Sequence, residues 1–143
     1  MVMNLVKITD LASIERSSGK VYPAGCTLIQ ISATRGQVVY HDKEGEVPSH
    51  YAVFLPNDKV VPKYLYHAIS YQAGHFLQTV QTGLNIQLDS LSEMKLKVHT
   101  DLEKQAEIVS YLDVIEKMEA SEEATIELLK QAKQTSLSEM FVG

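Results

Sequence analysis

The stretch DLEKQAEIVSYLDVIEKMEASEEATIELLKQAKQTSLSEMFV, Asp101 to Val142, contains no glycine or proline and is followed by Gly143. The absence of helix breakers over this length predicts one long helix, with Thr100 or Asp101 as its cap. At about 1.5 Å per residue such a helix is roughly 60 Å long, which is more than a small domain can bury. We therefore expect a helix that pairs with another in a coiled coil. A single solvated helix with an ordinary packing face is the alternative.

Apolar residues in this stretch recur at spacings of three and four, which places them along one side of the predicted helix. Glu119 and Glu122 interrupt this apolar stripe near its middle. A uniform two-stranded coiled coil would keep these positions apolar. The predicted contact with a second copy or another partner consists of Ile108, Leu112, Ile115, Ile126, Leu129, Leu137 and Met140.

The other 100 residues are enough for one modest hydrophobic core. The whole chain of 143 residues is 45% hydrophobic and 22% charged, as is usual for a soluble protein. Its charge is divided unevenly: residues 1–100 hold nine Lys and Arg against eight Asp and Glu, whereas residues 101–143 hold four against ten. The net charge of −5 therefore belongs to the helix, and charge leaves DNA binding by residues 1–100 open.

Several functional classes find no support in the sequence. No apolar run approaches the ~18 residues that cross a membrane, and the start of the chain is too short for a secretory signal, so a cytoplasmic protein without a membrane partner is expected. The five histidines include no pair at i and i+4, and Cys26 is the only cysteine, which argues against a metal site. Asp89, Glu93 and Lys95 resemble a nuclease metal site only superficially, because the gap between the acids is too short. We expect no catalytic residues, no cofactor and no enzymatic activity.

Alternating apolar residues and turn signals predict an α+β fold: a small strand-rich domain, residues 1–100, followed by the helix at 101–143. The apolar segment 50–55 is expected to be a central strand. A helix should begin with Pro62 in its first position and end at Gly74. The other expected elements are strands at 4–8, 27–32, 37–41 and 94–98, a turn and strand at 83–88, helical turns at 9–14 and 90–93, a short helix at 75–82, a loop at 15–25 and a turn at 42–45.

Four sequence phrases occur in an order that is more specific than any of them alone. They are AGCTLIQISATRGQV (Ala24–Val38), PKYLYH (Pro62–His67), GLNIQL (Gly83–Leu88) with Leu91, and LEKQAEIV (Leu102–Val109). In this order they resemble the G-D-x-L-x-x-x-x-G-x-x-G-x-v, y-L, G-x-x-x-x-x-l-s-x-x-x-l and P-L-x-E-Q-x-x-I-v segments of one family. The chain resembles the specificity subunit of type I restriction-modification enzymes, in a half-length form.

The resemblance implies a target-recognition domain that binds double-stranded DNA and carries a spacer helix. Full-length members have two such domains and two helices, and they read a split DNA sequence on behalf of methyltransferase and motor subunits. A half-length chain can restore this arrangement as an antiparallel homodimer that reads two inverted half-sites. The partners implied are therefore DNA, a second copy of the chain, and the methyltransferase subunit of the complex.

Two departures from the family pattern support an alternative function. The segment at the entry to the helix, His99–Gln105, lacks the usual prolines and has Lys104 in the place of a glutamate. The long stretch that supplies much of the family's DNA-reading surface is nearly absent here, between Gly19 and Tyr22. The alternative is a truncated specificity fragment that acts as a protein-interaction module or decoy without sequence-specific DNA reading.

Base reading needs hydrogen-bonding side chains on narrow loops, with cations beside them for the phosphates. Arg35 and Gln37 are the first candidates, because arginine can grip guanine and glutamine can grip adenine. Arg16, Lys20 and Lys43 are expected to contact phosphates, with His50 at the same edge. For each cation the alternative is an ordinary solvated surface residue.

Overall fold

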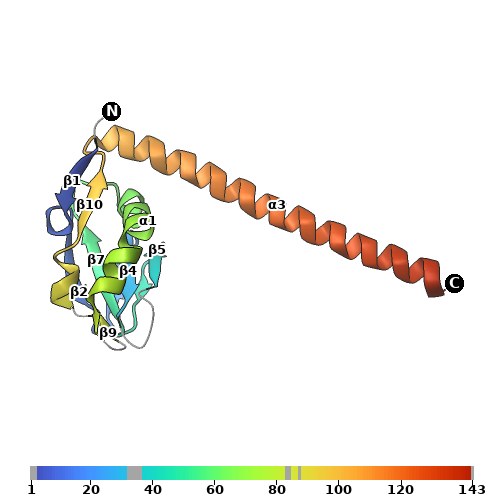
Figure 1. Ribbon diagram of the computed structural model, residues 1–143, viewed down its shortest axis with the longest axis horizontal. Coiled ribbons are helices and arrows are strands. Elements are labelled where there is room, and N and C mark those ends of the chain that lie inside the picture. The colour runs from blue at the N-terminus through green and yellow to red at the C-terminus, as the bar shows by residue number, and fades with distance from the viewer. Residues whose placement is uncertain (1–2, 32–36, 83–84, 87, 143) are drawn as a thin grey trace. The chain divides into compact units, whose positions relative to one another are not determined.

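The computed structural model describes residues 3–31, 37–82, 85–86 and 88–142, and it divides into two compact units. The first unit, Met1–Glu107, holds the described strands, the helices α1 and α2, and the start of helix α3 (Figure 1). The second unit, Ile108–Gly143, consists of the rest of α3 in its described part.

A four-stranded antiparallel sheet forms the centre of the first unit. Strand β7 has a neighbour on each side, and its residues Ala52, Val53 and Phe54 are fully buried, which confirms the prediction of a central strand. Helix α1 contacts β4 and β5, and its residues Leu65 and Ile69, four positions apart, are fully buried. The spatial order of the strands is β2 (Ala12–Arg16), β7 (Tyr51–Pro56), β4 (Cys26–Gln30) and β5 (Val38–His41).

Short strand pairs and turns surround this sheet in the described part of the chain. In β10 buried Leu96 and Val98 alternate with exposed Lys95 and Lys97, as the strand prediction at 94–98 requires. The strand pairs are β1 (Asn4–Lys7) with β10 (Lys95–Val98), β3 (Val21–Tyr22) with β6 (Gly45–Glu46), and β8 (Gln81–Thr82) with β9 (Asn85–Ile86). A 3₁₀ turn, η1 (Ile8–Asp10), follows β1, and α2 (Leu88–Leu91) precedes β10.

Two predictions about the first third of the chain are wrong. The helical turn expected at 9–14 is limited to η1, and the residues after it form strand β2. The loop expected at 15–25 contains the end of β2 and all of β3. The partner of β3 is β6, which includes Gly45, the last residue of the turn expected at 42–45. These polar segments become strands because they pair with residues about 25 to 45 positions away, which a local pattern cannot reveal.

The helix predicted to stop at Gly74 instead continues as α1 (Pro62–Val80), so the separate helix expected at 75–82 is also wrong. Ala73 and Leu77, on either side of this glycine, are buried. Their burial outweighs the cost of a glycine inside a helix, about 1 kcal/mol relative to alanine. The turn expected at 90–93 lies two residues earlier, as α2, and the strand expected at 83–88 is shortened to β9, with Gly83, Leu84 and Gln87 outside the described residues.

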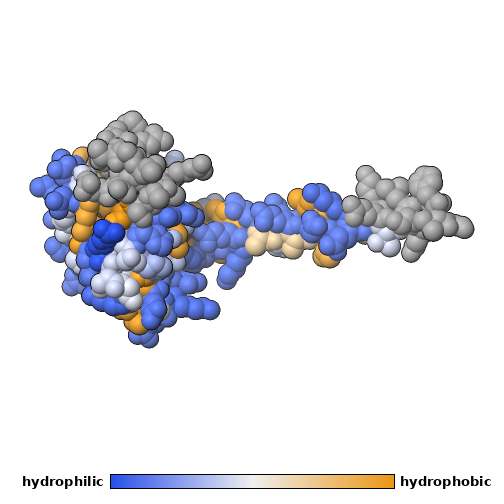
Figure 2. Space-filling model, turned by 90° about the horizontal axis from the view of Figure 1, so that it is seen from below, coloured by the Kyte–Doolittle hydropathy of each residue, from blue (hydrophilic) through white to orange (hydrophobic). Residues whose placement is uncertain are grey.

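Helix α3 (Leu102–Val142) confirms the long C-terminal helix. Of the two cap candidates, Asp101 provides the cap, because its Oδ1 accepts a hydrogen bond of 3.0 Å from the backbone N–H of Glu103. Figure 2 shows hydrophobic side chains on the helix surface beside hydrophilic ones. The apolar side chains that are more than half exposed are Tyr111, Val114, Met118, Ile126, Leu128 and Leu129.

Pairing of α3 with another helix stays a prediction. Three members of the predicted contact, Ile108, Leu112 and Ile115, are half-buried, whereas Ile126 and Leu129 are exposed. Leu137 and Met140 belong to the helix, but their side chains lie outside the part that the structure describes.

Candidate nucleic-acid interface

The sheet brings three of the predicted DNA contacts to one end. Arg16 is the last residue of β2, where it pairs with Ala52, and His50 immediately precedes β7. Gln37 immediately precedes β5, and its carbonyl oxygen accepts a hydrogen bond of 3.0 Å from the N–H of Gln30, the last residue of β4. Because neighbouring strands are antiparallel, the ends of β2 and β4 lie beside the starts of β7 and β5. We call this region the reading end, defined by Arg16, Gln37 and His50.

Arg35, the first candidate for base reading, lies outside the described residues together with the rest of 32–36. The residues on either side of this segment, Ile31 and Gln37, are described. The N–H of Ile31 donates a hydrogen bond of 2.9 Å to the carbonyl oxygen of His50, which places Ile31, like Gln37, at the reading end.

Two loops at the reading end are joined by hydrogen bonds. The buried hydroxyl of Ser17 donates to the carbonyl oxygen of Val47 at 2.5 Å, and Nε of Arg16 donates to the carbonyl oxygen of Ser49 at 3.0 Å. Gly19 has a φ of +83°, which favours glycine, and its N–H donates to the Ser17 hydroxyl at 3.1 Å. These bonds hold Arg16 in a defined place on the sheet.

Lys20 lies beside the reading end and is already paired within the chain. Its Nζ is 3.2 Å from Oε2 of Glu15 and 5.2 Å from the centre of the Tyr22 ring. The Tyr22 hydroxyl donates to the same Oε2 at 2.9 Å. The bonds from Tyr22 and Lys20 lower the pKa of Glu15, and the bond to Glu15 raises the pKa of Lys20. The Glu15 carboxylate thus offsets part of the charge that Lys20 could offer to a phosphate.

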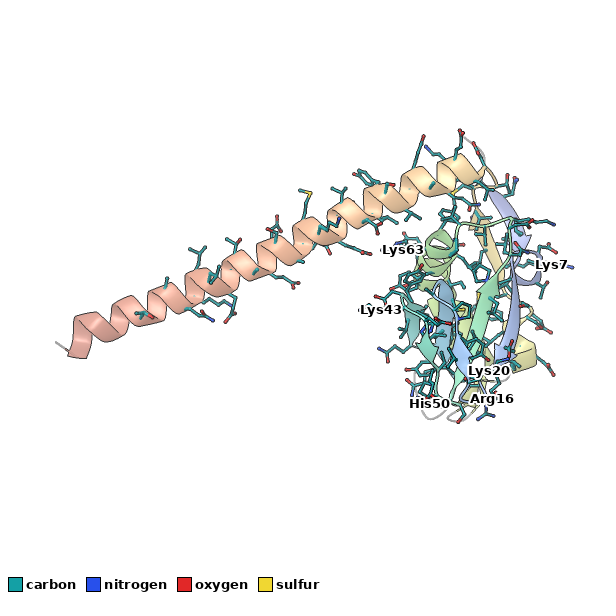
Figure 3. All side chains as sticks on the ribbon, turned by 180° about the vertical axis from the view of Figure 1, so that it is seen from behind. Lys7, Arg16, Lys20, Lys43, His50 and Lys63 are labelled. Atoms are coloured by element: carbon teal, nitrogen blue, oxygen red, sulfur yellow. The ribbon has the colours of Figure 1, made fainter. Side chains whose placement is uncertain are left out.

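His50 and Lys43 are placed differently. The His50 ring lies 4.6 Å from the ring of Tyr51, centre to centre, at the reading end. Lys43 follows β5 at its other end, and Figure 3 shows it apart from Arg16, Lys20 and His50. The structure therefore places Lys43 away from the reading end, and its contact with a phosphate stays a prediction.

Four further lysines are not among the DNA contacts predicted from the sequence. Lys7, Lys95 and Lys97 are exposed on the pair of strands β1 and β10. Lys63 of α1 has its Nζ 5.9 Å from the ring centre of Tyr40 on β5. The alternation in β10 could have revealed two of the three lysines as neighbours on one face.

Within the described residues, no group of three His, Cys, Asp or Glu side chains could hold a metal ion. The same part of the chain has no helix that is both long and apolar enough to cross a membrane.

The family model described as "Type I restriction modification DNA specificity domain" matches residues 3–131, which include the strand-rich unit and most of α3. The chain belongs to this family. A comparison with curated proteins found no match. The match to the family model confirms the expectation drawn from the order of the four sequence phrases.

Solved specificity subunits share the fold of this specificity-domain chain. The S subunit of a type I restriction-modification system from M. genitalium has a TM-score of 0.69 and 14% identity over 80% of this chain and 39% of that one. The HsdS subunit from Thermoanaerobacter tengcongensis has a TM-score of 0.62 and 17% identity over 84% and 39%. A chain from work on assembly and conformational transition of the type I R-M system has a TM-score of 0.66 and 17% identity over 84% and 40%. This chain spans about two fifths of the length of each.

Two residues of the specificity-domain phrases have a clear physical role here. Gly25 has a φ of +102°, and a Cβ at this position would lie 3.3 Å from Cβ of Pro62, so a side chain would be both strained and crowded. Gln105 is fully buried, and its Oε1 accepts a hydrogen bond of 2.7 Å from the N–H of Val61 while its Nε2 donates one of 2.7 Å to the carbonyl oxygen of His99. This glutamine joins the first turn of α3 to the segments before α1 and after β10.

Proposed function

We propose that this chain is the DNA-recognition subunit of a type I restriction-modification system and performs no catalysis itself. The observation that carries the proposal is the family match over residues 3–131. The reading end supports it, because Arg16, Gln37 and His50 supply a guanidinium, an amide and an imidazole at the ends of neighbouring strands of one sheet. Such groups can bind phosphates and base edges, and Arg35 would add a second guanidinium beside them.

The active form in this proposal is a homodimer, formed in the cytoplasm through the helix at 101–143. An antiparallel pair would supply two recognition domains and two helices, and would direct methyltransferase and restriction subunits to a bipartite site with inverted half-sites. The exposed apolar side chains of α3 support this arrangement, since large exposed apolar surfaces usually mark contacts. The proposed contact consists of Ile108, Leu112, Ile115, Ile126, Leu129, Leu137 and Met140.

A gel shift with random and palindromic duplexes over a salt series tests DNA recognition. We expect binding at low salt. The logarithm of the affinity should then fall linearly with the logarithm of the salt concentration, because the release of cations from DNA phosphates drives association. Arg35→Ala and Gln37→Ala should weaken binding to the palindromic duplex that the wild type prefers, by about 1–3 kcal/mol for each lost pair of base contacts. Absence of any shift at the lowest salt would contradict the proposal.

A specific observation favours the second candidate, a protein-interaction module or decoy that does not read DNA. Arg16 is bonded to the carbonyl oxygen of Ser49, Lys20 is paired with Glu15, and the segment between Ser17 and Tyr22 is a tight turn rather than a long reading loop. For this function we expect binding to a methyltransferase subunit without a salt-dependent gel shift. The two measurements together separate the candidates.

A further inference from the structure

The two-stranded sheet of β1 and β10 carries three lysines on one exposed face. The register places Lys7 opposite Lys95, and Leu5 opposite Lys97. These four residues are exposed, Leu5 by 63%, whereas Leu96 between the two β10 lysines is fully buried. Because successive strand residues point to opposite faces, the three ammonium groups lie on the same face. We call Lys7, Lys95 and Lys97 the lysine face.

The lysine face contains a like-charged pair in direct register. Directly opposite residues of an antiparallel pair have Cβ atoms about 4.5–5.5 Å apart, and like charges at this separation repel. Among the residues that the structure describes, none of the three lysines forms an ion pair with a carboxylate. Within the described residues, Lys7 and Lys95 therefore oppose each other with no carboxylate at ion-pair distance, and an external anion would relieve the repulsion.

The backbone beneath the lysine face is held in place from the side of α1. Oε1 of Gln72 accepts a hydrogen bond of 2.8 Å from the N–H of Lys97, and Nε2 of Gln72 donates one of 2.8 Å to the carbonyl oxygen of the same residue. On the other strand, the N–H of Ile8 extends the ladder with a hydrogen bond of 2.9 Å to the carbonyl oxygen of Met94. Figure 3 shows the side chain of Lys7 pointing away from the body of the unit. Hydrogen bonds therefore hold the backbone beneath the three lysines in place, and the lysine side chains are exposed.

We propose that the lysine face is a second DNA-contact surface of the recognition domain, one that binds phosphates and is separate from the reading end. This inference rests on the proposed function. The face suits DNA better than a protein, because lysine is depleted in protein interfaces, where its strongly hydrated ammonium would lose water. A phosphate contact keeps the ammonium partly hydrated and releases counterions from the DNA.

The test is the salt dependence of binding to a random-sequence duplex. We compare the wild type with a triple variant, Lys7→Gln, Lys95→Gln and Lys97→Gln. If each lysine neutralises one phosphate, the slope of log affinity against log salt becomes shallower by about 2.7 for each chain that contacts the duplex, since each phosphate contributes about 0.9. Between roughly 50 and 200 mM salt, the wild type then loses about 40-fold more affinity than the variant for each such chain.

A second triple variant, Lys59→Gln, Lys117→Gln and Lys130→Gln, removes the same charge from other exposed positions and should keep the wild-type slope. Thermal unfolding of the lysine-face variant should occur at the wild-type temperature or above, because a repulsive pair is removed. A lower unfolding temperature would contradict this account of Lys7 and Lys95.

The outcomes of the binding test distinguish a failure of the lysine face from a failure of the proposed function. A wild type that binds, with a lysine-face variant of unchanged slope, overturns the lysine face but leaves the proposed function in place. A wild type that does not bind at any salt overturns both. A variant with the wild-type slope that has lost self-association in sedimentation would assign the lysine face to the acidic helix of a second copy, and would overturn the DNA contact.

Discussion

Replacement of Gln105 by alanine should weaken the junction between the first turn of α3 and the strand-rich unit. The change leaves the N–H of Val61 and the carbonyl oxygen of His99 without their present partners. A buried polar group without a partner costs about 1–3 kcal/mol, which gives roughly 2–6 kcal/mol for the two. A groove of about 730 Å³ borders Gln105 and admits water, and alanine favours the helix slightly, so we expect the lower half of this range. The predicted loss in the free energy of unfolding is about 2–4 kcal/mol.

Urea unfolding at one fixed protein concentration, followed by tyrosine fluorescence, measures this loss. Gln131→Ala is the matched control, because Gln131 is exposed on the same helix, and its stability should stay within about 0.5 kcal/mol of the wild type. Gln105→Glu keeps an acceptor for Val61 but removes the donor to His99 and buries a carboxyl group, so it should also destabilise. A Gln105→Ala variant as stable as the Gln131→Ala control would refute this account of the junction.

Two further predictions concern the fold of the strand-rich unit. Gly25→Ala should destabilise the protein by about 1–2 kcal/mol, because Gly25 has a positive φ and lies close to Pro62. Gly74 lies in open space inside α1, so Gly74→Ala should stabilise the protein by up to about 1 kcal/mol. Changes of the same sign in the free energy of unfolding, measured with urea, would contradict this contrast. Tyr22→Phe removes the main cause of the lowered pKa of Glu15. A lowered folded-state pKa gives stability that is present above the ordinary glutamate value of about 4.3 and lost as pH falls through the folded value. The variant should therefore show a higher Glu15 pKa by NMR titration and a weaker loss of stability on acidification, and an unchanged Glu15 titration would argue against the shared hydrogen bond.

The sequence predicts those elements of the fold whose signals are local. The unbroken stretch that became α3 and the apolar runs that became β4 and β7 carry their signal within a few residues. Strand β2 does not, because locally Ser13 suits a helical turn and Glu15 a polar loop, and both pair with β7 about 40 residues later. Gly74 led to the wrong helix end for the same reason, since the burial of Ala73 and Leu77 depends on tertiary packing that a local pattern does not reveal.

The candidate site likewise combines features that local sequence signals reveal with features that depend on long-range strand pairing. The residue types Arg16, Gln37 and His50 could be selected from the sequence, but their meeting at one end depends on the register of four strands. The opposition of Lys7 and Lys95 depends on the pairing of the first strand with the last, almost 90 residues away. Periodicity and turn signals report only on residues close together in the sequence, so they cannot reveal a pairing over such a sequence separation.

The most direct test of the central claim, sequence recognition of DNA by a two-fold dimer, is selection of bound duplexes from a pool with a randomised region. The account predicts that repeated rounds enrich one sequence composed of two identical half-sites in inverted orientation, because a two-fold dimer presents the same reading end twice. A pool that stays random after repeated rounds, although the protein retains duplexes at low salt, would contradict sequence recognition by this chain.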